Sequence, residues 1–189
     1  VVTGRGVLMG NRELWHGAEA GVSVPRTSVP RMASSQASHV SVLRNYFHDN
    51  ARENLGYGVV VWQGAYALIE GNLFDRNRHA IAASWGPSNG YIARYNYILA
   101  GGYTVCEWWG CYYNQHFDVH GEFGGYGGRA GGYFSISSNT FRGEQTWILG
   151  QPTRAAFLLR GKPTMGAYLY GTVVVHNNAG EAARTKNAG

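Results

Sequence analysis

The residues best suited to chemistry lie in one short segment, where histidine, aspartate and histidine alternate with apolar residues. The segment is Gln115-His116-Phe117-Asp118-Val119-His120-Gly121. Alternate side chains of an extended strand point to the same face, so we expect His116, Asp118 and His120 to share one face. Two imidazoles and a carboxylate are typical ligands of zinc, iron and copper, and they also move protons near neutral pH. The segment therefore predicts either a metal site or an acid–base site.

Three further segments, residues 58–64, 78–84 and 155–161, align with this one at a terminal small residue. One set of alternate positions is apolar throughout and is predicted to point inward: Val60, Ala80, Phe117, Phe157, Trp62, Ala82, Val119 and Leu159. The other set is predicted to point outward: Val59, His79, His116, Ala156, Val61, Ile81, Asp118, Leu158, Gln63, Ala83, His120 and Arg160. Parallel strands lie about 4.8 Å apart. The alignment thus places His79 beside His116 and Arg160 beside His120.

The elements that would position these residues form a repeat that ends in asparagine. Its five copies are residues 40–45, 67–72, 91–96, 134–139 and 173–178. The asparagines are 27, 24, 43 and 39 residues apart, and an apolar residue follows two positions after each of the first four: Phe47, Phe74, Ile98 and Phe141. Alternation before each asparagine indicates strands, and a repeat of this length indicates a stacked solenoid whose two longer copies carry insertions. We expect Asn72, Asn96 and Asn139 to stack at a turn.

This repeat resembles that of the right-handed parallel β-helix proteins over residues 40–180. The resemblance implies an all-β fold, a right-handed parallel β-helix solenoid with an aromatic, disulfide-containing loop insertion. Pectate lyases, polygalacturonases, phage tailspikes and periplasmic copper-accessory proteins share this architecture, so the fold alone does not give the function. In the polysaccharide enzymes of this architecture, the resemblance implies, substrate lies along the parallel-sheet face in a groove walled by loops.

Length and composition fit one β-helix domain covering residues 1–189, with the clearest coils at residues 40–180. The first residues lack the charged and apolar stretches of a signal peptide, and no apolar run is long enough to span a membrane. A solenoid needs caps at both ends, and neither residues 1–6 nor the polar residues 181–189 have the pattern of one. We therefore expect the chain to be part of a longer β-helix.

The two cysteines, Cys106 and Cys111, enclose two adjacent tryptophans in the longest insertion. Two cysteines cannot complete a four-thiolate zinc site, and their spacing is not that of the redox C-x-x-C motif. A local disulfide is predicted, with free or metal-bound thiols as the alternatives. A disulfide would indicate an oxidising compartment, so the protein is expected to be secreted or periplasmic.

The net charge of +5 and the pI near 9.3 favour a polyanionic partner, and aromatic residues make up 14% of the chain. Aromatic rings can cover the C–H faces of sugars while basic side chains pair with uronate or sulfate, so an acidic polysaccharide is the expected partner. Nucleic acid fits the charge, but no recognition motif supports it. The insertion at 101–115 and the glycine-rich residues 121–132 are expected to wall the site. The expected substrate-binding residues are Trp108, Trp109, Tyr112, Tyr113, Lys162 and Arg78.

The favoured function is that of a carbohydrate-active protein that cleaves an acidic polysaccharide by lyase-type chemistry. Asp118 would orient an imidazole, His116 or His120 would move a proton, and Arg160 would neutralise a carboxylate of the substrate. Glycoside hydrolases need two carboxylates at the bond, and this face offers Asp118 alone. A lyase is therefore favoured over a hydrolase.

Three alternatives remain open. In the first, the protein is a metal-binding β-helix in which a divalent zinc, copper, iron or calcium ion is held by His79, His116, Asp118 and His120. In the second, it is a non-catalytic polysaccharide-binding or adhesin module that uses the aromatic walls. In the third, the histidines are ordinary exposed polar residues. No organic cofactor is expected, and the sequence does not predict the oligomeric state.

Overall fold

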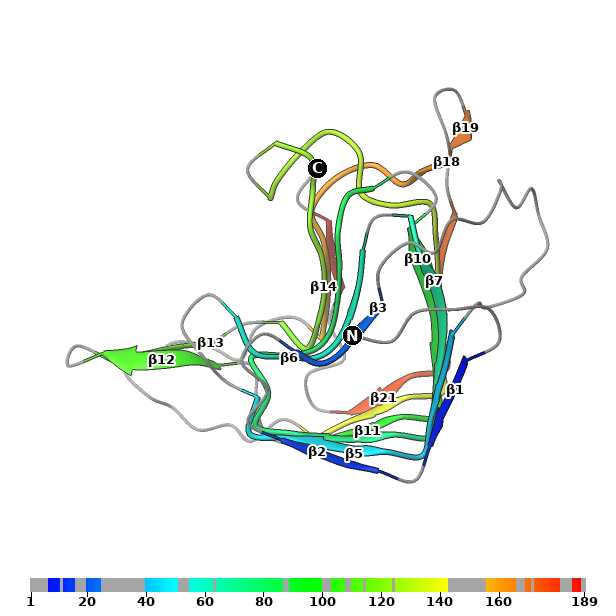
Figure 1. The fold of residues 1–189 in the computed structure, drawn as a ribbon. Coiled ribbons are helices and arrows are strands. Elements are labelled where there is room, and N and C mark those ends of the chain that lie inside the picture. Colours follow the sequence, from blue (N-terminus) through cyan, green and yellow to red (C-terminus); the bar gives the residue numbers. More distant parts are fainter. Residues whose placement is uncertain are drawn as a thin grey trace.

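The computed structural model contains strands and no helix in the residues that it describes (Figure 1). These residues are 7–10, 12–15, 20–24, 40–50, 55–62, 64–86, 89–99, 103–107, 110–113, 115–123, 125–142, 156–165, 169–170, 172–180 and 185–187. The description covers the backbone alone for residues 7–9, 15, 24, 165 and 180, and for β12 (Tyr103–Glu107), β13 (Gly110–Tyr113), β19 (Leu169–Tyr170), β20 (Thr172–His176) and β22 (Thr185–Asn187). The described part of the chain has no helix that is long and apolar enough to cross a membrane.

Most strands belong to three sheets of six parallel strands each. Sheet A consists of β1 (Val7–Gly10), β4 (Val40–Leu43), β7 (Tyr66–Glu70), β10 (Gly90–Arg94), β15 (Tyr133–Ser137) and β20. Sheet B consists of β2 (Glu13–Trp15), β5 (Tyr46–His48), β8 (Leu73–Asp75), β11 (Tyr97–Ile98), β16 (Thr140–Phe141) and β21 (Ala179–Gly180). Sheet C consists of β3 (Ala20–Val24), β6 (Tyr57–Val61), β9 (His79–Ala83), β14 (Phe117–Val119), β17 (Phe157–Leu159) and β22.

The chain passes from sheet A to sheet B to sheet C and back again, and each set of three strands is one coil. The successive coils, numbered 1 to 6, are β1-β2-β3, β4-β5-β6, β7-β8-β9, β10-β11-β14, β15-β16-β17 and β20-β21-β22. Figure 1 looks along the stack, so the strands of successive coils lie behind one another. The all-β class and the parallel pairing are as predicted, and the arrangement is compatible with a parallel β-helix.

Two antiparallel hairpins leave the coils, β12–β13 and β18 (Thr164–Met165) with β19. In Figure 1, β12–β13 extends from one end of sheet C, and the loop after β14 curls over the other end on the same side. The backbone register places Cys106 opposite Cys111. The side chains of both cysteines lie outside the described residues, so the disulfide stays a prediction.

The predicted asparagine stack is confirmed at the turn between sheets A and B, and it is longer than expected. Side-chain amides donate to the next carbonyl oxygen at 2.9–3.0 Å along the series Asn45, Asn72, Asn96, Asn139 and Asn178. The residue before each asparagine has a positive φ, between 53° and 66°. A shorter ladder that was not predicted joins Asn50 to Asn77 at 2.8 Å. Each ladder links successive coils at one fixed register.

The core fills the space enclosed by the three sheets. The apolar residues two positions after the asparagines are all buried and lie in one register column on sheet B: Phe47, Phe74, Ile98 and Phe141. Sheet A adds Tyr91 and Phe134, and the ring of Tyr91 meets the rings of Phe134 and of Phe117 from sheet C edge-on. The asparagine repeat thus predicts one side of the core correctly.

Sheet C departs from strict alternation where coils 1 to 5 enter it, because two consecutive residues there both face the core. The pairs are Gly21–Val22, Gly58–Val59, Ala80–Ile81, His116–Phe117 and Ala156–Phe157. A Cβ on Gly21 or Gly58 would lie 2.9 Å or 2.8 Å from a core phenylalanine ring, and the ring of His116 lies 5.9 Å from that of Phe141. We call these the entry pairs.

The entry pairs correct the predicted faces of sheet C. Besides His116, five residues predicted to point outward lie in the core: Val59, Val61, Ile81, Ala83 and Ala156. Trp62, predicted inside, is 39% exposed. Val60 and Ala82, also predicted inside, share a register column with Asp118, which lies between the core residues Phe117 and Val119 and so faces outward. The inward prediction is confirmed for Ala80, Phe117, Val119, Phe157 and Leu159.

Candidate functional site

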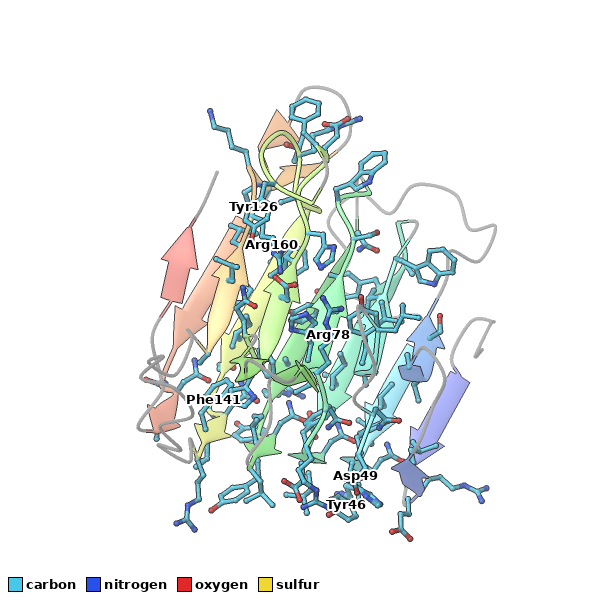
Figure 2. All side chains as sticks on the ribbon, turned by 90° about the vertical axis from the view of Figure 1, so that its left-hand side faces the viewer. Tyr46, Asp49, Arg78, Tyr126, Phe141 and Arg160 are labelled. Atoms are coloured by element: carbon cyan, nitrogen blue, oxygen red, sulfur yellow. The ribbon has the colours of Figure 1, made fainter. Side chains whose placement is uncertain are left out.

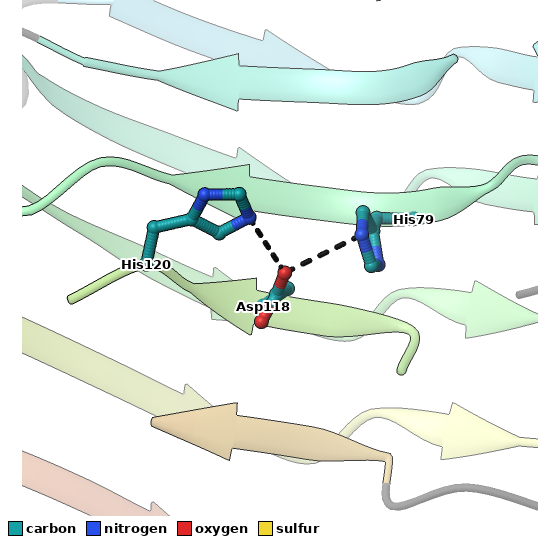
Figure 3. Close-up of side chains that lie close together, drawn as sticks. All are labelled: His79, Asp118 and His120. Atoms are coloured by element: carbon teal, nitrogen blue, oxygen red, sulfur yellow. Dashed lines mark ion pairs between the residues drawn. The ribbon is translucent and has the colours of Figure 1, made fainter. Parts of the chain in front are cut away.

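Three of the predicted polar residues meet on the outer face of sheet C (Figure 3). His79 begins β9 in coil 3, while Asp118 lies in β14 of coil 4 and His120 directly follows that strand. Nε2 of His79 lies 3.3 Å from Oδ2 of Asp118, and Nε2 of His120 lies 2.9 Å from the same oxygen. One carboxylate oxygen therefore faces two imidazoles.

His79 reaches Asp118 because of the entry pair that follows it. Ala80 and Ile81 both face the core, so His79 and Ala82 are consecutive outward positions. Ala82 is the register partner of Asp118. In a regularly alternating strand, residues three apart would lie on opposite faces. The irregular start of β9 thus brings His79 to the carboxylate and stacks its ring on that of Tyr57, 5.6 Å away in the neighbouring coil.

The contact of Nδ1 shows which ring nitrogen of His79 carries the proton. Nδ1 lies 2.6 Å from the backbone oxygen of Gln115, and a carbonyl oxygen only accepts, so Nδ1 carries a proton. Burial lowers the pKa of His79 to about 4, Arg78 and His120 lower it too, and Asp118 only partly opposes them. The ring is therefore neutral at pH 7, and Nε2 carries a lone pair. That lone pair faces the oxygen of a carboxylate, and Nε2 has no hydrogen-bond partner among the described residues.

Asp118 is a fully buried carboxylate that is held by an arginine of coil 5. Nε of Arg160 donates to Oδ1 at 2.7 Å, and Nη2 donates to Oδ2 at 2.6 Å. Burial by itself would raise the pKa of Asp118, but His120 and Arg160 outweigh burial and lower the pKa to about 2. The carboxylate is therefore ionised at neutral pH, and its orientation is fixed by a two-pronged bond.

His120 connects the buried cluster with the surface. Its side chain is 33% exposed, yet Nε2 is buried and makes no hydrogen bond of acceptable geometry among the described residues. The opposite side of its ring faces the loop after β14, where a Cβ on Gly125 would lie 4.0 Å from Nδ1. His120 is thus the member of the cluster that a molecule from solution can approach.

The three side chains could hold a metal ion. Each residue offers one donor atom, and these three atoms lie within 4.8 Å of one another. Donors about 2.0–2.2 Å from a tetrahedral zinc ion are about 3.4 Å apart, so the spacing fits after small rotations. The bond from Nδ1 of His79 to a backbone oxygen is also the usual outer contact of a metal-bound histidine.

His116 lies apart from this cluster. It is the first residue of an entry pair, its counterparts in the adjacent coils are Ala80 and Ala156, and its ring packs near Phe141. Burial lowers its pKa to about 4, so the ring is neutral at pH 7. The predicted common face therefore holds for Asp118 and His120 but not for His116, and His79 lies beside the backbone of Gln115 instead of beside His116.

The basic residues predicted to bind substrate have different surroundings. Figure 2 shows Arg78 near the centre of sheet C and Arg160 above it, close to Tyr126. Nη1 of Arg78 donates to the hydroxyl of Tyr57 at 2.9 Å, whereas Lys162 is exposed. Arg160 is committed to Asp118, so a substrate carboxylate would have to pair with another cation. Four other predicted residues lie outside the described side chains: Trp108, Trp109, Tyr112 and Tyr113.

The loop after β14 contributes residues that the sequence did not single out. Tyr126 is 49% exposed, and its ring covers the guanidinium of Arg160 at 4.7 Å. Arg129 pairs with Glu122 and lies 5.3 Å from the ring of Trp85, which is 39% exposed. The sequence signal was the run of glycines with interspersed aromatic residues at 121–132, which predicts a wall but not its contacts.

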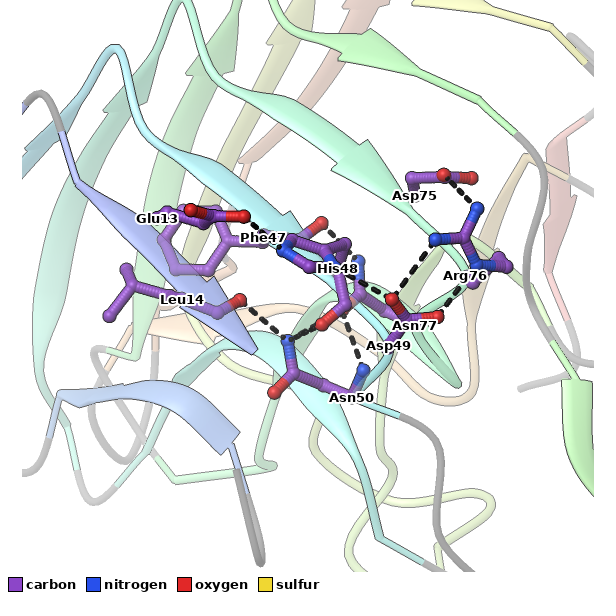
Figure 4. Close-up of polar contacts among 9 residues, drawn as sticks. All are labelled: Glu13, Leu14, Phe47, His48, Asp49, Asn50, Asp75, Arg76 and Asn77. Carbon is purple, nitrogen blue, oxygen red and sulfur yellow. Dashed lines mark hydrogen bonds and ion pairs between the residues drawn. The ribbon is translucent and has the colours of Figure 1, made fainter. Parts of the chain in front are cut away.

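A second polar cluster lies on sheet B (Figure 4). Nδ1 and Nε2 of His48 lie 2.7 Å and 2.9 Å from carboxylate oxygens of Asp49 and Glu13. Arg76 pairs with Asp49 at 2.6 Å and with Asp75 at 2.5 Å. Both nitrogens of His48 face acceptors, so this imidazole is stabilised as the cation, in contrast to His79. The cluster is an ion-pair network that joins coils 1, 2 and 3.

Comparison with protein-family models, with curated proteins and with solved structures finds no match for this chain. The functional conclusion therefore rests on the residues of the site.

Proposed function

We propose that this protein is a metal-binding, right-handed parallel β-helix protein whose metal centre consists of His79, Asp118 and His120. One observation carries the proposal. Nε2 of His79 lies 3.3 Å from Oδ2 of Asp118 and makes no hydrogen bond among the described residues, whereas Nδ1 of the same ring bonds to the backbone oxygen of Gln115. Two acceptors at this distance repel each other, and a cation between them removes the repulsion.

The donor set favours a transition metal. Two imidazole nitrogens and one carboxylate oxygen suit zinc, copper or iron, whereas calcium takes six to eight oxygen ligands. Calcium, which the sequence left open, is therefore not the proposed ion. When bound, the ion would act as a Lewis acid or activate a water molecule. The protein would hold it with two neutral imidazoles and one carboxylate.

Metal analysis of protein purified without an affinity tag tests the proposal. We expect a stoichiometric amount of zinc, copper or iron, and its loss in His79→Ala and His120→Ala. His48→Ala is the matched control, because it removes an imidazole from the sheet B cluster and should leave the metal content unchanged. The proposal fails if the native protein contains no metal and calorimetric titration with each of the three ions gives no binding that depends on His79 and His120.

Lyase-type cleavage of an acidic polysaccharide is the second candidate, and the exposure of His120 favours it. This imidazole contacts Asp118 at 2.9 Å and is 33% exposed, as a general base oriented by a carboxylate would be. Exposed aromatic rings and Lys162 lie on the neighbouring loops, in keeping with a sugar chain as partner. Together with the predicted disulfide, this supports a secreted or periplasmic location.

The two candidates can be separated by assaying polygalacturonate, alginate and chondroitin sulfate with and without a chelator. Lyase chemistry predicts a product that absorbs in the ultraviolet, formed in the presence of chelator and lost in His120→Ala. Activity that disappears with chelator and returns with added metal favours the metal centre. If His120→Ala cleaves as fast as the parent, His120 is not the base.

A further inference from the structure

We infer that Arg160 positions Asp118 so that the carboxylate gives the metal ion one oxygen and leaves a coordination position open to an anion from solution. This inference rests on the metal centre proposed above. It assigns Arg160 a positioning role, not direct contact with the ion.

Arg160 holds the carboxylate along one edge. Its Nε binds Oδ1 at 2.7 Å and its Nη2 binds Oδ2 at 2.6 Å, while Oδ2 also faces the two imidazoles. A carboxylate oxygen has two lone pairs, so Oδ2 can accept from Arg160 and still bind a cation. Turning both oxygens of Asp118 toward the ion would break the two-pronged bond.

Arg160 is itself held in place. Its side chain is 11% exposed, and Tyr126 covers its guanidinium at 4.7 Å. Its backbone oxygen accepts from the amide of Gly127 at 2.6 Å, which ties it to the loop that carries Tyr126. The contact with Asp118 is therefore a preorganised buried pair and not a mobile surface ion pair.

A carboxylate that gives one oxygen leaves the ion with three protein donors. Structural zinc sites have four protein ligands, whereas sites that bind water or substrate have three. The ion would bring two positive charges and Arg160 one, against the single negative charge of Asp118. An anionic oxygen or nitrogen donor is therefore the favoured fourth ligand.

Cobalt(II) is a suitable probe, because its visible spectrum depends on the number and type of its ligands. We expect azide to shift the visible bands of the cobalt-loaded protein in a saturable way. In Arg160→Met, Asp118 is free to turn, so we expect both oxygens to bind, the bands to weaken and the azide response to be lost. Arg129→Met is the matched control, since Arg129 lies on the loop after β14 and pairs with Glu122 instead of Asp118, and it should respond like the parent.

The outcomes distinguish the inference from the proposal beneath it. If cobalt does not bind, the metal centre itself is contradicted. If cobalt binds but azide leaves the parent spectrum unchanged, or if Arg160→Met responds like the parent, only the role of Arg160 is wrong. Should Arg160→Met fail to fold, as judged by circular dichroism, Arg160→Lys replaces it, because lysine keeps the charge but cannot bridge both oxygens. In that variant we expect a reduced azide response.

Discussion

At the residue scale, Asp118 and His120 belong to one cluster but should contribute very differently to the stability of the fold. Asp118 is fully buried against Arg160, whereas a third of the His120 side chain is exposed. Removing one partner of a buried ion pair costs about 3–5 kcal/mol, because the other charge is left unpaired. Exposed substitutions usually cost less than about 1 kcal/mol.

We therefore expect Asp118→Ala to lower the free energy of unfolding by about 3–5 kcal/mol. His120→Ala should change it by less than about 1 kcal/mol while abolishing metal binding. Urea unfolding of the two metal-free variants, compared with the metal-free parent, measures both. Equal stability of Asp118→Ala and the parent would show that the pair with Arg160 is not formed.

Comparing Phe117 with Trp62 tests the corrected faces of sheet C, because strict alternation predicted both side chains inside. It is fully buried in the core, so Phe117→Ala should lower the free energy of unfolding by about 3–5 kcal/mol. Trp62→Ala is the control, since Trp62 is 39% exposed and should cost much less, despite the hydrogen bond from its indole to Ser23. If Trp62→Ala lowered the free energy of unfolding more than Phe117→Ala, the exposed position of Trp62 would be contradicted and strict alternation would be supported.

At the element scale, the asparagine ladder replaces hydrogen bonds that water would otherwise make at the turn. Oδ1 of Asn96 accepts from the backbone and side-chain nitrogens of Asn72, both at 3.0 Å, and its Nδ2 donates to Ile69. Each rung therefore satisfies groups of two neighbouring coils.

Asn96→Ala should thus leave buried groups unpaired and lower the free energy of unfolding by about 2–4 kcal/mol, at about 1–3 kcal/mol for each unpaired group. Asn178→Ala, which alters a half-buried ladder residue, should cost less. Chemical unfolding of both variants gives the comparison. A smaller loss at Asn96 than at Asn178 would argue against the ladder.

The space at the first residue of each entry pair of sheet C differs between coils, and it limits the size of the side chain there. A Cβ on Gly58 would lie 2.6 Å from the backbone oxygen of Ala80 and 2.8 Å from the ring of Phe74. Gly58→Ala should therefore destabilise the protein by about 1–3 kcal/mol through overpacking, even though alanine occupies the same column at residues 80 and 156. Thermal unfolding tests this, and a gain in stability would show that the corner has room.

The sequence predicted those elements that depend on local patterns. The asparagine spacing gave the stacked strands and one wall of the core, because each copy repeats the same turn and the same buried residue. It could not give the faces of sheet C, since an entry pair arises from the bend between two sheets and has no fixed residue type. Glycine, alanine and histidine all occupy its first position.

The same limit explains the candidate site. Asp118 and His120 were correctly placed on one face because β14 alternates regularly around Val119. His79 joins them only through the entry pair that follows it, and His116 leaves them because it belongs to one. The contact of Tyr126 with Arg160 depends on how a glycine-rich loop closes, which residue types alone do not specify.

At the scale of the whole molecule, the ion-pair network on sheet B joins three coils and makes the stability of the fold depend on pH. Burial lowers the pKa of His48, but its hydrogen bonds to Asp49 and Glu13 outweigh burial and raise the pKa above 6.5. Protonated His48 therefore stabilises the folded state fully below pH 6.5, and this contribution is lost as pH rises through the raised folded pKa.

We expect the parent protein to melt at a higher temperature than His48→Gln at pH 6, and the difference to shrink by pH 8.5. Circular dichroism melts of both proteins, without metal and at one ionic strength, measure it. A difference that is constant or grows with pH would contradict the assignment of His48 as a cation.

The cluster of His79, Asp118, His120 and Arg160 draws its members from coils 3, 4 and 5, and this has a mechanical consequence. The covalent chain runs around each coil, so neighbouring coils are held together lengthwise by hydrogen bonds and packing. An ion bound to His79 and Asp118 would add coordinate bonds in the lengthwise direction. The metal centre would then cross-link adjacent coils. The metal-loaded protein should therefore withstand a greater pulling force along its axis than the metal-free protein.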